Sequence, residues 1–400
     1  MKKSLQLGIS LALTVLVGYL IYRGVPDWGL AGRVMIQGRP HFMLAGLGFV
    51  LLHMLLRAVR WGVLLTPVKR GISLKNLFSL TLIKYTVNVI PPRAGELAAS
   101  FLLASKERVS AASVIAASLL ERILDMMTVV VIFGIYMSFF SHWYAPSSER
   151  GKEVMLRIRS YSLKGFIVLC LGFAVLALLL RSNQWQERLP AKLRSILSPF
   201  LDGFRGLQQG GVLFQSILLS AAIWLVITLQ LWCFMLAYLD HFPFVGSLFL
   251  MAITVVGVAI PTPGGAGGFQ FFMDLALVNF FARYLSSHDP QSQAAGISNG
   301  SYIVSMIPVI LTGLYFLNRE GLSFGSVSRL AAQKPQLSTA HGKHWTQIAQ
   351  IDADLKRSSF KKLTQTSRAP QRGFLGPLSW EPFMLLRSTI EHENVSCRYG

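Results

Sequence analysis

Long apolar segments recur along this sequence, and several have the length of a membrane-crossing helix. A helix rises about 1.5 Å per residue, so about 20 apolar residues cross the hydrocarbon layer of a bilayer. Six segments meet this requirement without interruption, at residues 5–22, 42–64, 111–140, 162–180, 212–239 and 297–317. The sequence therefore predicts an all-α polytopic membrane protein with about six full transmembrane helices.

The composition agrees, since 52% of the 400 residues are hydrophobic and only 14% are charged, whereas a soluble domain carries about 25% charged residues. The start, "MKKSLQLGISLALTVLVGYLIYRG", imitates a secretory signal peptide. Its apolar run is too long for one and no small-residue cleavage site follows, so we expect a retained first span. Residues 1–320 form the predicted transmembrane domain. Residues 321–400 are polar and basic and predict a largely disordered cytoplasmic tail.

Two further apolar stretches are interrupted by proline and glycine. Residues 76–104 contain "NVIPPRAGE", and residues 244–284 contain "IPTPGGAGG". Proline removes a backbone donor and glycine frees the backbone, so neither stretch forms one smooth helix. Irregular backbone is not tolerated against lipid, so each break must be buried in protein or line an aqueous cavity. We predict two re-entrant hairpins that turn at the breaks.

The basic residues, 38 against 18 acidic ones, cluster between the apolar runs. This placement indicates loops at an anionic membrane surface rather than a nucleic-acid site. With both termini in the cytoplasm, the basic segments 57–75 and 181–205 fall inside, and 141–161 is an exception. The two hairpins then enter from opposite sides as a weak inverted repeat, as in transporters. Chance similarity of two Ile-Pro breaks is the alternative.

Three charged residues lie inside the apolar segment 111–140, namely Glu121, Arg122 and Asp125. At helical spacing Glu121 and Asp125 share a face, and Arg122 can pair with Asp125. Each costs about 2.5–3.5 kcal/mol at the bilayer centre, so they must face one another, the bundle interior or water. Two interpretations stay open at this point: a structural ion-pair network between helices, or the lining of a substrate path.

The first break brings Arg93 and Glu96 to membrane depth, and Lys84 and Asn88 share a face of the half-helix before it. A cavity that holds Lys84, Arg93 and Arg122 would favour an anion such as a lipid phosphate. All of these residues are candidates for the substrate pathway.

The second break adds the candidates Gly264, Gly265, Gly267, Gly268 and Gln270. We expect backbone N–H groups at the start of a helix near Phe269, where they would attract anions, or else close packing through small residues. A separate group, Arg57, Arg60 and Trp61, is predicted near a membrane interface.

No pattern of catalytic or metal-binding residues is visible. The three cysteines lie far apart without metal or disulfide spacing, and the glycine-rich break lacks the Lys-Ser/Thr ending of a nucleotide loop. We expect His53 to be hydrogen-bonded in the core, and Asp274 to be either a pathway group or a satisfied buried acid. The sequence thus predicts no enzyme activity, no cofactor and no metal.

Four segments in order, "RAVRW" at 57–61, "NVIPPRAGE" at 88–96, "ASLLERILD" at 117–125 and "IPTPGGAGG" at 260–268, carry a family resemblance. Over about residues 1–320 the chain resembles the membrane region of lysylphosphatidylglycerol synthases and the related stand-alone flippase-like proteins. The resemblance implies a bacterial inner-membrane protein that moves lipids or lipid-linked sugars between leaflets. It maps the polar site onto Arg93, Glu96, Glu121, Arg122, Asp125 and the glycines of the second break.

The chain departs from that family at two positions. Gln270 stands where the family often has Glu, and Ser301 stands near the position where it often has Arg. An exchanged ion pair, a different head group or a degraded site would each explain this double change. The soluble aminoacyl-transferase domain is not found, so we do not expect this chain alone to aminoacylate lipid.

The function expected from these features is translocation of an anionic phospholipid or a polyprenyl-phosphate-linked sugar through a polar cleft. No ATP site is evident, so transport would be downhill or ion-coupled. Two alternatives remain: an enzyme or accessory subunit of polyprenyl-phosphate or glycolipid synthesis, and a scaffold whose tail holds lipid-modifying enzymes as partners.

Overall fold

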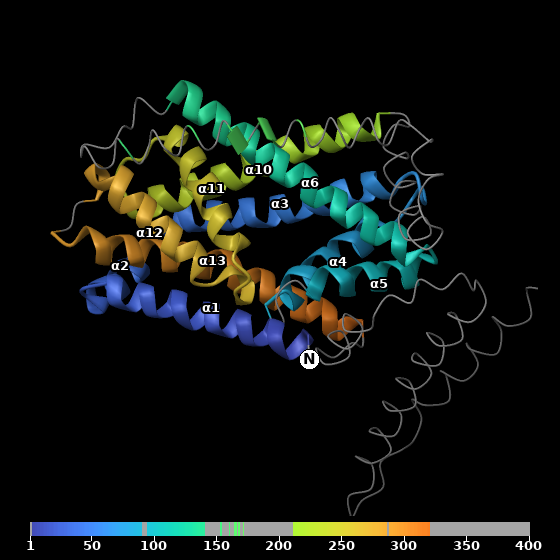
Figure 1. Ribbon diagram of the computed structural model, residues 1–400, viewed down its shortest axis with the longest axis horizontal. Coiled ribbons are helices and arrows are strands. Elements are labelled where there is room, and N and C mark those ends of the chain that lie inside the picture. Colours follow the sequence, from blue (N-terminus) through green and yellow to red (C-terminus); the bar gives the residue numbers. More distant parts are fainter. Residues whose placement is uncertain are drawn as a thin grey trace, which may run out of the picture. The chain divides into compact units, whose positions relative to one another are not determined.

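The computed structural model describes residues 2–89, 94–140, 211–285 and 288–320, with isolated residues between 153 and 171. All regular elements in these ranges are helical (Figure 1). The helices are α1 (Lys2–Gly24), α2 (Trp28–Ile36), α3 (Pro40–Leu65), α4 (Leu74–Val87), α5 (Ala94–Glu107), α6 (Ala111–Ile135), η1 (Tyr136–Phe140), α10 (Val212–Tyr238), α11 (Phe244–Ala259), η3 (Pro263–Gly265), α12 (Gly268–Phe280), η4 (Ala282–Tyr284) and α13 (Pro290–Arg319).

Four helices in the described ranges are long and apolar enough to cross a membrane. They are α3, α6 continued by η1, α10 and α13, and each coincides with a predicted span. Helix α1, with 23 residues, matches the first predicted span in extent. The all-α polytopic membrane fold is thereby confirmed. The span predicted at 162–180, the boundary at residue 320 and the tail fall outside the described residues or on isolated ones.

The first interrupted stretch forms a helical hairpin, made of α4 and α5. Glu107, the last residue of α5, accepts hydrogen bonds from Asn76 at the start of α4 (2.9 Å) and from Lys69 just before it (2.7 Å). These contacts join the beginning of α4 to the end of α5. The two helices therefore run antiparallel, and the break lies at the closed end of the hairpin.

The second interrupted stretch forms a hairpin of α11 and α12 in the same way. The rings of Phe242, before α11, and Phe281, after α12, lie 5.1 Å apart and define its open end. Near the closed end, Gly257 and Gly268 pack backbone to backbone, because a Cβ on either residue would clash with the other's carbonyl oxygen. Small residues at these two positions allow α11 and α12 to approach each other closely.

Helix α3 shows that the two hairpins enter from opposite ends of the bundle. At the start of α3, the Arg39 amide donates to the carbonyl of Ala237 (2.9 Å), near the end of α10 and the open end of the second hairpin. The other end of α3, at Leu65, leads directly to Lys69 and the open end of the first hairpin. Figure 1 shows α4 with α5 and α11 with α12 at opposite ends of α3. This is the arrangement expected of an inverted repeat.

The two breaks meet inside the bundle and are held there by α13. The hydroxyl of Tyr302 donates to the carbonyl of Gly264 (3.0 Å) in the second break. A Cβ on Gly264 would lie 3.6 Å from Val89 in the first break. Farther along α13, Gly313 packs closely against Thr86 of α4. In the second break Thr262 and Gly265 are buried, whereas residues 90–93 of the first break lie outside the described residues.

Each hairpin has its own hydrophobic core. Trp61, Leu80 and Leu103 belong to the core around the first hairpin, whereas Phe234 and Phe249 belong to the core around the second. The short helix α2 was not predicted from the sequence. Its start is capped by Asp27, whose carboxylate accepts from the Leu30 amide at 2.9 Å.

The contact between Gly257 and Gly268 predicts a specific sensitivity. We expect Gly257→Ala to force α11 and α12 apart and to lower the free energy of unfolding by about 1–3 kcal/mol, as overpacking does. Gly48→Ala is the matched control, because it is also in a helix and a Cβ there meets nothing within 4 Å. Thermal unfolding in detergent measures both, and equal midpoints for the two variants would contradict the close packing.

The hydrogen bonds to Glu107 at the open end of the first hairpin predict that the stability of the fold depends on pH. Hydrogen bonds from Lys69 and Asn76 hold the pKa of Glu107 below its ordinary value of 4.5. A lowered carboxyl pKa stabilises the fold above pH 4.5, and this stabilisation is lost as the pH falls through the folded-state pKa. Glu107→Gln should therefore melt below the wild type at pH 6 and converge with it toward pH 3. A difference in melting temperature between the variant and the wild type that stays constant from pH 6 to pH 3 would contradict these hydrogen bonds.

Candidate functional site

Helix α6 separates its three charged residues onto two faces. Glu121 and Asp125 are buried, and both point toward α3. Arg122 lies between them in sequence but points outward, with 45% of its side chain exposed. The shared face predicted for Glu121 and Asp125 is confirmed. The predicted pairing of Arg122 with Asp125 is wrong, because Arg122 pairs with Glu96 of α5 instead.

Asp125 binds two arginines of α3. Its Oδ1 atom accepts from the Arg60 Nη1 atom at 2.7 Å, and its Oδ2 atom accepts from the Arg57 Nη1 atom at 3.0 Å. Arg57 and Arg60 are three residues apart, which places both on one face of α3. One carboxylate therefore holds two guanidinium groups between α3 and α6.

Glu121 continues the cluster to α4. The Lys84 ammonium donates to the Glu121 Oε2 atom at 3.1 Å, and the Arg60 Nη2 atom lies 3.7 Å from the Oε1 atom. Arg57, Arg60, Lys84, Glu121 and Asp125 together form one network, called here the buried charge cluster. It joins α3, α4 and α6 at the level of the first hairpin.

Aromatic and hydroxyl groups surround the buried charge cluster. From α10, Ser220 accepts from Arg60 (2.8 Å) and the Trp224 indole donates to Asp125 (3.3 Å). The Arg57 guanidinium lies 5.9 Å from the ring centre of Tyr85, and the Lys84 ammonium lies 5.1 Å from that of Trp61. Cations over aromatic faces gain electrostatic stabilisation that is larger when water is absent.

The cluster is dry and has more positive than negative charge. The exposed fractions of its side chains are 0% for Arg60, 6% for Glu121, 7% for Lys84, 10% for Asp125 and 11% for Arg57. Three basic and two acidic groups leave a formal charge of +1. Three of the buried N–H positions, Arg57 Nε, Arg60 Nε and Arg60 Nη2, have no hydrogen-bond partner within the described part of the chain. The cluster thus has an excess of positive charge and free donors.

Arg57, Arg60 and Trp61 lie inside the bundle, where Arg60 and Trp61 are fully covered and the Arg57 side chain is 11% exposed. Asp125 compensates the two arginine charges and so allows both to leave water. Lys69 and Arg70 lie in the loop after α3, and Lys75 lies in the first turn of α4. The depth of the three residues relative to the membrane interface stays a prediction.

At the first break, Glu96 and Arg122 form a half-exposed ion pair next to the buried charge cluster. Asn88 uses its side-chain oxygen to accept from the Gly95 amide (2.8 Å), and so joins the end of α4 to the start of α5. A Cβ on Gly95 would clash with the carbonyl of Lys84, which explains the glycine in "PPRAGE". Arg93 lies outside the described residues.

At the second break, three glycines adopt backbone angles that other residues avoid. Gly264, Gly265 and Gly267 have φ values of +62°, +77° and +81°. Gln270 accepts from the Gly267 amide at 2.8 Å, so this N–H group is satisfied within the loop and is not free for an anion. Gly268 makes the close contact with Gly257. These contacts are structural, and a pathway role for the five residues stays a prediction.

Two other polar residues discussed above are also buried. Ser301 is buried and donates to the carbonyl of Ile297 at 2.7 Å. His53 is buried on α3, and its Nδ1 atom has no hydrogen-bond partner among the described residues. Among the described residues, no three His, Cys, Asp or Glu side chains lie together as a metal site would require.

The comparison with known families agrees with this geometry. Residues 6–313 match the family described as the lysylphosphatidylglycerol synthase TM region. The chain belongs to this family. The match covers every described helix that can cross the membrane, and it includes both hairpins and the buried charge cluster. No curated protein is detectably similar to the chain.

Sequence reasoning missed the part that α3 and α10 play in the site. The signal for Arg57 and Arg60 was present, because two arginines three residues apart in a long apolar run must share a partner. Ser220 and Trp224 gave no such signal, since serine and tryptophan are ordinary residues of an apolar helix.

The cluster predicts that two neighbouring acid–base pairs differ strongly in their contribution to stability. Asp125→Asn removes the carboxylate bonded to Arg57 and leaves Arg60 with Glu121 at 3.7 Å as its acidic neighbour, so it should destabilise the protein by about 3–5 kcal/mol. Arg122→Gln, only three residues away, breaks a half-exposed pair and should cost about 0–1 kcal/mol. Unfolding in mixed detergent micelles measures both variants. Similar decreases in the free energy of unfolding for the two variants would contradict the burial of Asp125.

Proposed function

We propose that this chain moves an anionic lipid, a phospholipid or a polyprenyl-phosphate-linked sugar, between the leaflets of the bacterial inner membrane. The family relates it to membrane lipid handling. The observation that carries the proposal is the excess positive charge of the buried charge cluster, together with its unpartnered guanidinium N–H groups. A phosphate would supply the missing negative charge and the missing acceptors.

In this conformation the cluster is closed, and Glu121 and Asp125 pair with its three cations. A phosphate that enters would add one negative charge beside Arg57, Arg60 and Lys84 and bring the formal charge of the cluster from +1 to zero. Because the carboxylates stay in place, no cation is left unpaired in hydrocarbon. The lipid tails would remain in the bilayer throughout.

The half-exposed pair of Glu96 and Arg122 is suited to the first contact with the head group. It lies beside the first break and borders the cluster through α6, and Arg122 is the more exposed partner. A phosphate that draws Arg122 from Glu96 would next meet Lys84, which is bonded to the neighbouring Glu121. Arg93, in the same break, would add a further positive charge to this entry.

The proposal describes a transporter with both termini in the cytoplasm and no catalytic step. Charge pairing at the cluster needs no bond cleavage, and transport would run downhill or be coupled to an ion. The alternatives, an enzyme of lipid synthesis and a scaffold for such enzymes, are tested in the same preparation.

The test is leaflet exchange in liposomes that contain the purified chain and fluorescent phosphatidylglycerol or polyprenyl phosphate. The double variant Lys84→Met, Glu121→Met removes one buried pair with similar volume, a change that is often neutral for folding. We expect normal folding, and exchange slower by at least about tenfold, because one charge-assisted contact to the head group is lost. Arg122→Ala should also slow exchange.

The matched control removes an ion pair far from the cluster. Arg39 and Asp240 pair at the opposite end of α3, where the Asp240 side chain is 86% exposed. Arg39→Gln, Asp240→Asn should leave exchange unchanged. If the Lys84, Glu121 double variant folds and exchanges lipid like the wild type, the cluster is only structural and the proposal fails. Head-group modification of the labelled lipid would instead support the enzyme alternative.

A further inference from the structure

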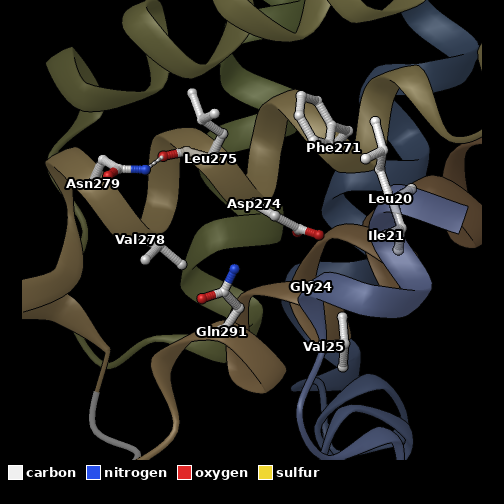
Figure 2. A pocket seen from close by; sticks show the side chains of 10 residues that line it. All are labelled: Leu20, Ile21, Gly24, Val25, Phe271, Asp274, Leu275, Val278, Asn279 and Gln291. Carbon is white, nitrogen blue, oxygen red and sulfur yellow. Dashed lines mark hydrogen bonds between the residues drawn. The ribbon is translucent and has the colours of Figure 1, made fainter. Parts of the chain in front are cut away.

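A pocket separate from the buried charge cluster lies between α1, α12 and the start of α13. Its volume is about 230 Å³, the share of about eight water molecules at about 30 Å³ each. Figure 2 shows Asp274 of α12 pointing into it, with α1 opposite and Gln291 of α13 below. The proposed translocation mechanism makes no use of this pocket.

Asp274 is the only ionisable residue among the ten that line the pocket. Its Oδ1 atom is buried and has no hydrogen-bond partner within the described ranges, and the hydroxyl of Ser298 on α13 donates to the Ala295 carbonyl at 3.2 Å. The nearest arginine on α1, Arg23, is not among the lining residues and lies over the ring of Tyr19 instead. A buried acceptor without a partner is costly, so a ligand that donates a hydrogen bond here would be favoured.

The remaining polar groups of the pocket are two amides. Figure 2 shows the nitrogen of Gln291 toward Asp274 and its oxygen turned away, and the Asn279 nitrogen donates to the Leu275 carbonyl at 2.7 Å. The carboxyl group of Asp274 points into the pocket. Its two oxygens are too few for Mg²⁺ or Ca²⁺, which take about six to eight ligands, and they suit the N–H donors of a primary ammonium group.

The walls of the pocket are apolar, and they continue to the outer surface of the bundle. Ile21 of α1 and Val25, directly after it, line the pocket together with Phe271 and Val278 of α12. Leu20 and Leu275, which also line the pocket, are 45% and 42% exposed. In a membrane protein an apolar surface of this kind contacts lipid, so a ligand with a small cationic head and an apolar body reaches the pocket directly from the bilayer.

We propose that this pocket binds the ammonium head group of a membrane lipid, with Asp274 as its counter-charge. The Asp274 carboxylate accepts a charge-assisted hydrogen bond from the ammonium. The glycerol backbone and tails lie along Leu20 and Leu275. The site is independent of the buried charge cluster, so its test is separate from the test of the proposed function.

The test measures binding of short-chain lipids to the purified full chain in detergent. Dioctanoyl phosphatidylethanolamine should bind at least about tenfold more tightly than dioctanoyl phosphatidylglycerol or phosphatidylcholine, a difference of about 1.4 kcal/mol or more. The choline head group has the charge but no N–H donor, so equal binding of choline and ethanolamine lipids would overturn the proposed hydrogen bonding. Free ethanolamine should compete only weakly, because it lacks the apolar body.

Two variants test the pocket by different means. Asp274→Asn keeps the shape and removes the charge, and Gly24→Leu fills the space, since a Cβ on Gly24 meets only the Gln291 amide nitrogen at 3.8 Å. Each should weaken ethanolamine-lipid binding at least about tenfold. Asp240→Asn, at an exposed acid elsewhere, should not change it. If both pocket variants keep the wild-type elution profile and affinity, the lipid binds elsewhere and the proposal is wrong.

Discussion

Burial of charge away from water is the constraint on which this structure depends. Arg60 is fully covered, and such a guanidinium is tolerated only with a carboxylate beside it. Asp125 and Glu121 fulfil this need on α6, so the positions of α3, α4 and α6 are fixed relative to one another by charge as well as by packing. Helix α10 is drawn into the same network through Ser220 and Trp224.

A second constraint is that irregular backbone must not face lipid. The second break lies against the end of α4, with Gly264 close to Val89, and Tyr302 of α13 is bonded to the Gly264 carbonyl. The described residues at the closed ends of the two hairpins therefore contact each other and α13 rather than standing alone.

The sequence was informative where a physical rule left few solutions. Apolar runs of about 20 residues predicted α3, α6 and α10 closely and α13 without its first turns, which begin at Pro290 rather than at residue 297, and "PPRAGE" and "PTPGGAGG" predicted the hairpins. The partner of Arg122 was not predictable, because Asp125 and Glu96 both lie within reach of an arginine and only tertiary packing decides between them. The burial of Arg57 and Arg60 was missed for the same reason. Near the end of an apolar segment, arginines are interpreted as loop residues unless an acidic residue that faces them is known.

The two halves of the inverted repeat resemble each other in backbone but differ in chemistry. Around the first hairpin, three cations share two carboxylates, so this half has an excess of positive charge. Beside the second hairpin, Asp274 lies in an apolar pocket lined by no basic residue, so its carboxyl group has no basic partner in that pocket. Gln270 and Ser301 bond locally and add charge to neither half. A chain with such a difference does not present the same chemistry at its two hairpins.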